Sequence, residues 1–131
     1  MKRKYFLATL GALAGSLVFG KTPAVLPIKK DVIFTCFIRG YQYHKGKKHE
    51  QHFKPNQPLQ LVREPENEYD PFAIAVYYKK IKLGYLPAEH NAILNTKLAL
   101  KHNITAKLIA VNLNAPDWER VEINITEEFY A

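Results

Sequence analysis

Two short stretches of this chain carry residue types suited to binding chemistry, and the first is the turn-forming sequence REPENEYDP, residues 63–71. Tyr69 offers an aromatic face on which a nucleic-acid base can stack. The neighbouring Asp70 offers a carboxylate that can accept a hydrogen bond from a hydroxyl group. Each residue also has a structural explanation, because Asn67 and Asp70 favour turns and Tyr69 can cover a core. The residue types alone leave both explanations open.

The second stretch interleaves aromatic and basic side chains in the sequence GYQYHKGKK, residues 40–48. Tyr41 and Tyr43 could stack on nucleic-acid bases. Lys45 and Lys48 could contact the phosphates that join such bases. Lysines in a polar segment are also common as solvated residues without a partner. The pattern adds weight to nucleic-acid binding without establishing it.

The histidines and acids form no recognisable metal or catalytic signature. His44, His49 and His52 have the spacing H-x4-H-x2-H, but they lack a fourth ligand and stand among lysines, which disfavour a cation. The sequence also lacks the motifs of a serine hydrolase, a zinc protease, a phosphate-binding loop and a dinucleotide-binding turn. We therefore predict no metal site, no catalytic residue and no enzymatic activity.

Composition indicates one folded domain with a moderate positive charge. The chain has 131 residues, of which 47% are hydrophobic and 24% are charged, values typical of a globular protein. The formal net charge is +7. Without residues 1–20, the chain has 16 basic and 12 acidic side chains, a net charge of +4, which favours an anionic partner only moderately. The lone Cys36 excludes an intramolecular disulfide.

The first twenty residues have the layout of an export signal. Lys2, Arg3 and Lys4 precede an uncharged, largely apolar run over residues 5–20. As a helix this run would rise about 24 Å, less than the ~30 Å hydrocarbon core of a bilayer, which favours a cleaved leader. We predict a signal peptide or N-terminal anchor over residues 1–20, and hence an exported (periplasmic or extracellular) or membrane-anchored protein. If the leader is not functional, the protein is cytoplasmic.

The segment after the leader contains Pro23 and Pro27, which indicate an extended linker. We predict that this linker covers residues 21–30 and that one domain covers residues 31–131. Residues 41–58 are polar and are expected to form a solvated loop.

Hydrophobic periodicity within the domain predicts six short strands and one helix. The expected strands cover residues 32–40, 59–63, 72–78, 81–86, 104–112 and 121–129, and the expected helix lies within residues 88–101. Connections this short favour an antiparallel sheet that curls into a small barrel. The core of the barrel is expected to contain Phe34, Ile38, Leu61, Ile74, Val76, Leu86, Leu108 and Ile123.

The stretch REPENEYDPFAIAV, followed by KLGYLP, resembles the HIRAN family. The family pattern is a strand ending in REP, a turn NPYD, a strand AIxV, and a Gly-Tyr-hydrophobic-Pro step into a helix. The resemblance begins at the strand FIRGYQY and continues through PAEHNAIL to the closing strands, so it covers about residues 32–129. It implies a mainly β (α+β) fold, namely a small OB-like antiparallel β-barrel with one or two helices. Such domains accompany DNA-repair helicases and also occur as stand-alone bacterial proteins.

The resemblance also implies a ligand. In eukaryotic members the domain captures single-stranded DNA at its 3′ end, where aromatic residues hold the terminal bases and the NPYD turn recognises the terminal hydroxyl. The positions that match these roles are Tyr43, Asn67, Tyr69 and Asp70.

Three positions depart from the pattern of the end-binding members. Gln42 replaces an arginine, Glu68 replaces the proline of NPYD, and Ala88 replaces a lysine. The loss of two cations weakens phosphate contact, and Glu68 adds a negative charge close to Glu64 and Glu66.

We therefore predict a nucleic-acid-binding module that recognises single-stranded DNA 3′ ends. Tyr43 and Tyr69 are expected to stack on bases. The complete predicted set is Tyr43, Lys45, Lys48, Arg63, Asn67, Tyr69, Asp70 and Tyr85, in which Arg63, Lys45 and Lys48 meet phosphates. Nothing in the sequence indicates a small-molecule cofactor or an oligomer. The alternative is an exported protein- or ligand-interaction module that keeps the barrel without DNA binding.

Overall fold

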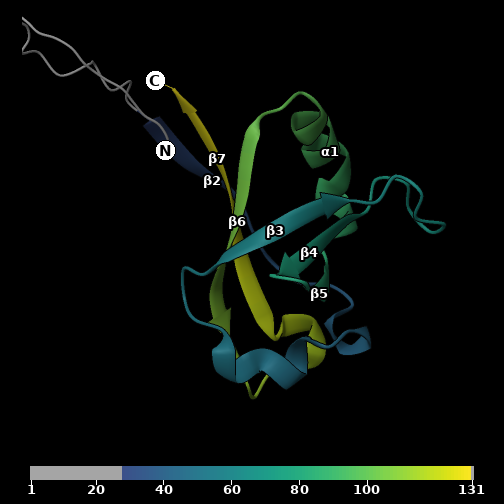
Figure 1. The fold of residues 1–131 in the computed structure, drawn as a ribbon, viewed down its shortest axis with the longest axis vertical. Helices are drawn as coiled ribbons and strands as arrows, with labels where there is room; N and C mark the ends of the chain where they lie inside the picture. Colours follow the sequence, from purple (N-terminus) through teal and green to yellow (C-terminus); the bar gives the residue numbers. More distant parts are fainter. Residues whose placement is uncertain (1–27, 131) are drawn as a thin grey trace, which may run out of the picture.

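The structure of the chain is a computed structural model that describes residues 28–130. The predicted leader, residues 1–20, and most of the predicted linker lie outside the described residues. In chain order the elements are β2 (Ile28–Phe37), η1 (Tyr41–Tyr43), η2 (Gly46–His52), β3 (Pro58–Arg63), β4 (Ile74–Tyr78), β5 (Ile81–Tyr85), η3 (Ala88–His90), α1 (Asn91–Ala99), β6 (Asn103–Val111), η4 (Asp117–Glu119) and β7 (Val121–Tyr130), where η denotes a 3-10 helix. Figure 1 shows this arrangement, and in the described part of the chain no helix is long and apolar enough to cross a membrane.

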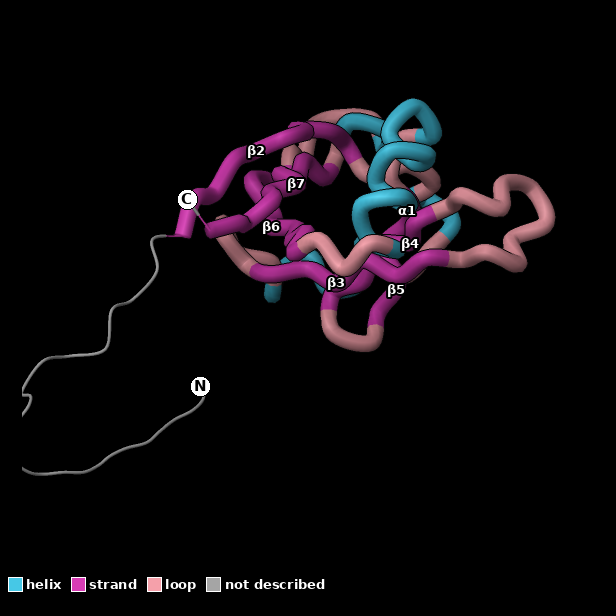
Figure 2. The backbone as a smooth tube through the Cα atoms, turned by 90° about the horizontal axis from the view of Figure 1, so that it is seen from above, coloured by secondary structure: helices cyan, strands magenta, loops and turns pink. Residues whose placement is uncertain are grey.

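Within residues 28–130, six strands form one antiparallel sheet in the order β2-β7-β6-β3-β4-β5. The two ends of this order meet just after β2, where Arg39 and Tyr85 exchange two backbone hydrogen bonds of 2.8 Å each. This bridge closes the sheet into a barrel, and Figure 2 shows the strands curving around a common interior with α1 beside β4. The predicted OB-like antiparallel barrel is therefore confirmed.

The first strand begins earlier than the sequence predicts. Lys29 and Lys30 pair with Phe129 and Glu128 of β7, so β2 starts at Ile28 and includes the last three residues of the predicted linker. The sheet register shifts between Val32 and Phe34, a bulge that bends the long strand.

The core fills the barrel as predicted. Six of the expected core residues are at most 2% exposed, namely Ile38, Ile74, Val76, Leu86, Leu108 and Ile123. Phe34 and Leu61 are partly buried and pack against this cluster. Phe72, predicted to begin the strand over residues 72–78, is exposed and lies in the preceding turn, because β4 begins only at Ile74.

The polar segment after β2 is not the solvated loop that its composition predicts. It contains η1 and η2, and the side chain of Tyr41 is completely buried. The Tyr41 hydroxyl donates a hydrogen bond of 2.7 Å to Oε2 of Glu50, and Arg120 donates to both carboxylate oxygens of Glu50 at 2.7 and 2.9 Å. Gly46 makes room for the ring, because a Cβ there would lie 2.4 Å from Cε1 of Tyr41. Burial of Tyr41 is favourable because its hydroxyl and the carboxylate that it meets both have partners.

The predicted helix consists of η3 followed by α1, and part of its buried face is polar. Leu94 is buried, but Ile93 and Leu100 are exposed. Asn91 and Asn95 occupy buried positions instead, where their amides hydrogen-bond to the turn before β4. Polar contacts between the helix and this turn therefore decide which helix face is covered.

Candidate nucleic-acid interface

Asn67 organises the turn between β3 and β4. Its Oδ1 accepts hydrogen bonds from the backbone amides of Tyr69 at 2.8 Å and Asp70 at 3.0 Å. Its own backbone amide donates to the carbonyl of Glu64 at 3.0 Å. These bonds hold the backbone of the turn, whereas the side chain of Tyr69 is 90% exposed. The turn thus presents an aromatic ring to solvent on an ordered backbone.

Asp70 connects the turn to the start of α1. Its Oδ1 accepts a hydrogen bond of 2.8 Å from the backbone amide of Phe72, and its Oδ2 accepts one of 2.8 Å from Nδ2 of Asn91. A carboxylate has about four lone-pair positions, so Asp70 retains capacity for a donor on a ligand. Asn91 is 4% exposed and is a positioning residue that the sequence does not reveal, because its partner stands far away in the chain.

Glu64 lies behind the turn and links it to β5. Its carboxylate accepts hydrogen bonds from Nδ2 of Asn67 at 3.1 Å, from Nζ of Lys82 at 2.7 Å and from the hydroxyl of Tyr85 at 2.9 Å. Burial acts to raise the pKa of Glu64, but the hydrogen bonds from Lys82, Asn67 and Tyr85 outweigh it and hold that pKa below its usual value. Glu64 is therefore ionised at neutral pH and ties Tyr85 to the turn.

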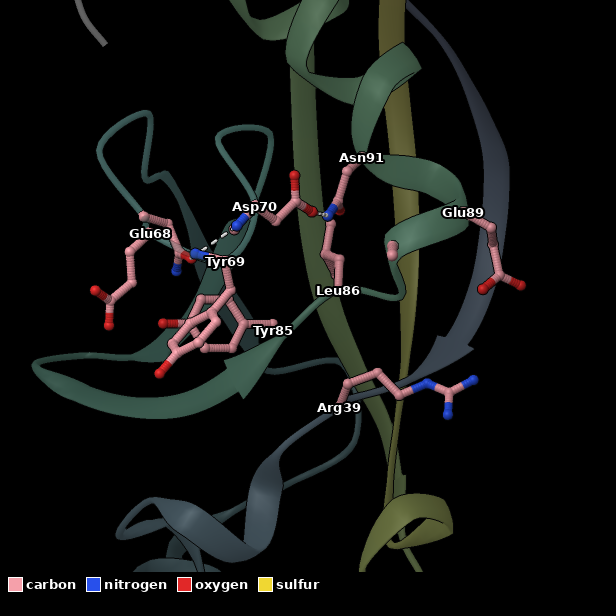
Figure 3. A pocket seen from close by; sticks show the side chains of 11 residues that line it. Arg39, Glu68, Tyr69, Asp70, Tyr85, Leu86, Glu89 and Asn91 are labelled. Atoms are coloured by element: carbon pink, nitrogen blue, oxygen red, sulfur yellow. Dashed lines mark hydrogen bonds between the residues drawn. The ribbon is translucent and has the colours of Figure 1, made fainter.

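A cleft of about 690 Å³ lies between this turn, the end of β5 and the start of the helical segment. Figure 3 shows Tyr69 and Tyr85 on one side of Leu86 and Arg39 on the other side. The side chain of Asp70 is directed toward Asn91. Stacking surface, an apolar floor and a carboxylate are thus found in one concavity.

The structure brings together one half of the predicted site residues. Asn67, Tyr69, Asp70 and Tyr85 line the cleft. The other four, Tyr43, Lys45, Lys48 and Arg63, are exposed but are not part of the cleft lining.

The residues outside the lining have different surroundings. Tyr43 ends η1 and is 79% exposed, and Lys45 and Lys48 flank or belong to η2. Arg63 ends β3, where its Nε donates a hydrogen bond of 2.9 Å to Oδ1 of Asn95. Base stacking by Tyr41, which the sequence allowed, is excluded because its ring lies in the core.

The cleft is also more acidic than expected of a site that binds phosphates. Its lining includes the acidic residues Glu68, Asp70 and Glu89, and Arg39 is the one basic residue among the described residues that line it. Arg39 reaches the cleft through its backbone bridge to Tyr85, a residue distant in the chain, so the sequence does not reveal it as a site residue.

The histidines near the cleft do not assemble into a metal site. His44 makes an edge contact with the ring of Tyr85, with centroids 6.0 Å apart. Burial and the nearby Lys82 lower the pKa of His44. Over residues 28–130 the structure contains no group of three or more His, Cys, Asp or Glu side chains that could hold a metal ion.

The barrel and its aromatic cleft define a small OB-like module, and sequence comparison identifies its family. A sequence model of the HIRAN domain matches residues 32–130. The chain belongs to the HIRAN domain family, whose members are in general DNA-binding modules, and the resemblance found in the sequence is confirmed.

Two crystal structures share the fold. A protein from Lactobacillus plantarum superposes with a TM-score of 0.66 and 18% sequence identity, over 79% of this chain and 100% of that chain. The HIRAN domain of human HLTF superposes with a TM-score of 0.58 and 22% identity, over 74% of this chain and 75% of that chain. At these identities the likeness concerns the fold alone. A search of curated protein sequences found no match.

Proposed function

We propose that this HIRAN domain binds the 3′ end of single-stranded DNA in the cleft, and that it acts by binding and not by catalysis. The observation that carries the proposal is the exposed ring of Tyr69, held beside Asp70 on a turn whose backbone is hydrogen-bonded to Asn67. A general DNA-binding role of the family supports the same class of ligand.

The chemistry of the turn suits a strand terminus. Tyr69 can stack on a terminal base, an interaction worth about 1–3 kcal/mol per base. Asp70 can accept a hydrogen bond from a free 3′-hydroxyl, and its negative charge repels a 3′-phosphate. The two neighbours therefore combine affinity for a base with discrimination between two kinds of strand end.

The lining of the cleft supports binding without reaction. Among the described residues that form it there is no serine, cysteine or histidine, the side chains that most often act as nucleophile or general base. Asp70 accepts hydrogen bonds from Phe72 and Asn91, which hold it in place as an acceptor. We propose no catalytic residue and no cofactor.

A second candidate is an interaction module for a protein or small ligand, acting outside the cytoplasm. The acidic side chains of Glu68 and Glu89 in the cleft favour it, because they oppose a polyanion. The export signal predicted over residues 1–20 also favours it. Salt dependence separates the candidates, because phosphate recognition weakens steeply as salt is raised from about 0.05 to 0.2 M.

Fluorescence anisotropy with a short, 5′-labelled single strand tests the proposal. The strand with a free 3′-hydroxyl should bind more tightly than the same strand with a 3′-phosphate. Tyr69→Ala should lower affinity by about one to two decades, whereas the matched Tyr69→Phe should retain it. Asp70→Asn should mainly remove the discrimination between the two ends, because the amide carries no charge.

Two results would contradict this function. One is equal binding of both strand ends by the unsubstituted protein. The other is no binding at micromolar protein in roughly 0.05 M salt, where phosphate contacts are strongest. Either result would favour the interaction module.

A further inference from the structure

Five of the fifteen lysine and arginine side chains in residues 28–130 are paired with acids. The ion pairs are Lys30–Glu128, Lys47–Asp117, Lys82–Glu64, Lys97–Glu127 and Arg120–Glu50. Arg39 is not among these five: it is exposed, it has no carboxylate within 4 Å among the described residues, and it is the one basic residue in the described lining of the cleft. Its guanidinium is therefore available to an anion that enters the cleft.

Two hydrogen bonds to Tyr85 hold the backbone of Arg39 at the cleft wall. Its N–H donates to the carbonyl of Tyr85 and its carbonyl accepts from the N–H of Tyr85, both at 2.8 Å. Gly84 permits this close approach, because a Cβ at that position would lie 2.3 Å from the carbonyl oxygen of Arg39. The φ of Gly84 is also +152°, which L side chains rarely adopt. The same contacts that close the barrel fix where the Arg39 side chain begins.

We propose that Arg39 is the phosphate-binding residue of the cleft, an inference that rests on the proposed binding of a strand end. A guanidinium offers two parallel N–H donors that match two phosphate oxygens. Figure 3 shows Arg39 across Leu86 from the turn that carries Tyr69 and Asp70. A strand whose terminal nucleoside lies at Asp70 then runs over Leu86, and one of its phosphates meets Arg39.

This assignment replaces the phosphate contacts predicted from the sequence. Lys45 and Lys48 do not line the cleft, and the Nε of Arg63 is engaged by Asn95. Glu89, which also lines the cleft, limits the contact to few phosphates because it repels the next one.

A salt titration tests the charge contact. Affinity for a single strand with a free 3′-hydroxyl is measured between roughly 0.05 and 0.2 M salt for the unsubstituted protein and for Arg39→Gln, Arg39→Lys and Lys107→Gln. Arg39→Gln should weaken binding about tenfold at low salt and lower the slope of log affinity against log salt by about 0.7. Arg39→Lys should keep the slope and lose part of the affinity, because an ammonium lacks the planar fork. Lys107→Gln removes an exposed charge from β6 and should leave the affinity within about twofold.

A neutral backbone locates the contact on the strand. Uncharged methylphosphonate linkages are placed one at a time at the phosphates nearest the 3′ end. At one position, the uncharged linkage should weaken binding to the unsubstituted protein by the same factor as Arg39→Gln does. The same linkage should not weaken binding to the Arg39→Gln variant any further. Such non-additivity identifies a direct contact between the two groups.

The outcomes separate this inference from the function on which it rests. If the unsubstituted protein prefers the free 3′-hydroxyl but Arg39→Gln keeps the full affinity and salt slope, Arg39 is not the phosphate-binding residue and the proposed function stands. Additive losses at every linkage would also overturn the assignment. If the unsubstituted protein binds no strand, both proposals fail. The melting temperatures of the variants should equal that of the unsubstituted protein, because the side chain of Arg39 is exposed.

Discussion

Tyr41 and Tyr69 have similar settings in the sequence and opposite settings in the structure. Both stand in polar stretches that suggest base stacking. In the fold, Tyr41 is 0% exposed and Tyr69 is 90% exposed. The difference arises from partners of the buried tyrosine: Glu50 accepts a hydrogen bond from the hydroxyl of Tyr41, and Arg120, which is distant in the chain, neutralises Glu50. An aromatic residue in a polar stretch is thus a binding candidate only when the fold leaves its ring uncovered.

The largest predicted difference between the two tyrosines is in the free energy of unfolding. Tyr41→Ala should lower it by about 3–5 kcal/mol, because it removes a buried aromatic ring and leaves Glu50 without one of its donors. Tyr69→Ala should change it by no more than about 0.5 kcal/mol. Urea denaturation followed by circular dichroism measures both values.

Tyr41→Phe separates the contribution of the buried ring to stability from that of the hydroxyl. It keeps the ring and removes only the hydrogen bond to Glu50, so its cost should be smaller than that of Tyr41→Ala. Equal costs for Tyr41→Ala and Tyr69→Ala would show that the two rings do not differ in burial.

A smaller effect on the free energy of unfolding is expected at Glu64, which is hydrogen-bonded to Asn67 in the turn that carries Tyr69. Glu64→Gln should destabilise the protein by about 1 kcal/mol at neutral pH, because the amide keeps one acceptor but loses the charge that binds Lys82. Glu66→Gln is the matched control, since Glu66 is an exposed carboxylate in the same turn.

The pH dependence of this difference has a definite sign. The pKa of Glu64 is lower in the folded protein than usual, so its contribution is complete above the unfolded pKa of about 4.3 and is lost as the pH falls through the folded pKa. The stability gap between the unsubstituted protein and Glu64→Gln should therefore close in acid. A gap that stays constant down to pH values below the folded pKa would show that the charge of Glu64 does not stabilise the turn.

The strands of the barrel are predictable from the sequence because their signal is local. Alternation such as that of Val121, Ile123 and Ile125 identifies a half-buried strand without knowledge of its neighbours. The buried face of α1 is not predictable in this way. Asn91 and Asn95 are buried because Asp70 and the carbonyl of Phe72 accept their amide protons, and those partners lie in another part of the chain.

The same division applies to the candidate site. Asn67, Tyr69 and Asp70 form a short contiguous motif, so their proximity follows from the sequence itself. The position of Arg39 depends on the bridge to Tyr85 that closes the barrel, which the order of residues does not show. The lysine-rich segment is misleading for the corresponding reason, because composition does not reveal that η2 lies outside the cleft lining.

Chemical-shift mapping by NMR tests most directly the claim that the turn and its cleft, and not the lysine-rich segment, hold the strand end. The ¹⁵N-labelled protein is titrated with a short single strand that has a free 3′-hydroxyl. We predict that the largest amide shifts occur over residues 67–70 and 84–89, around the cleft, while the amides of η2 (Gly46–His52) change little. Shifts concentrated in η2, with residues 67–70 unaffected, would contradict the account.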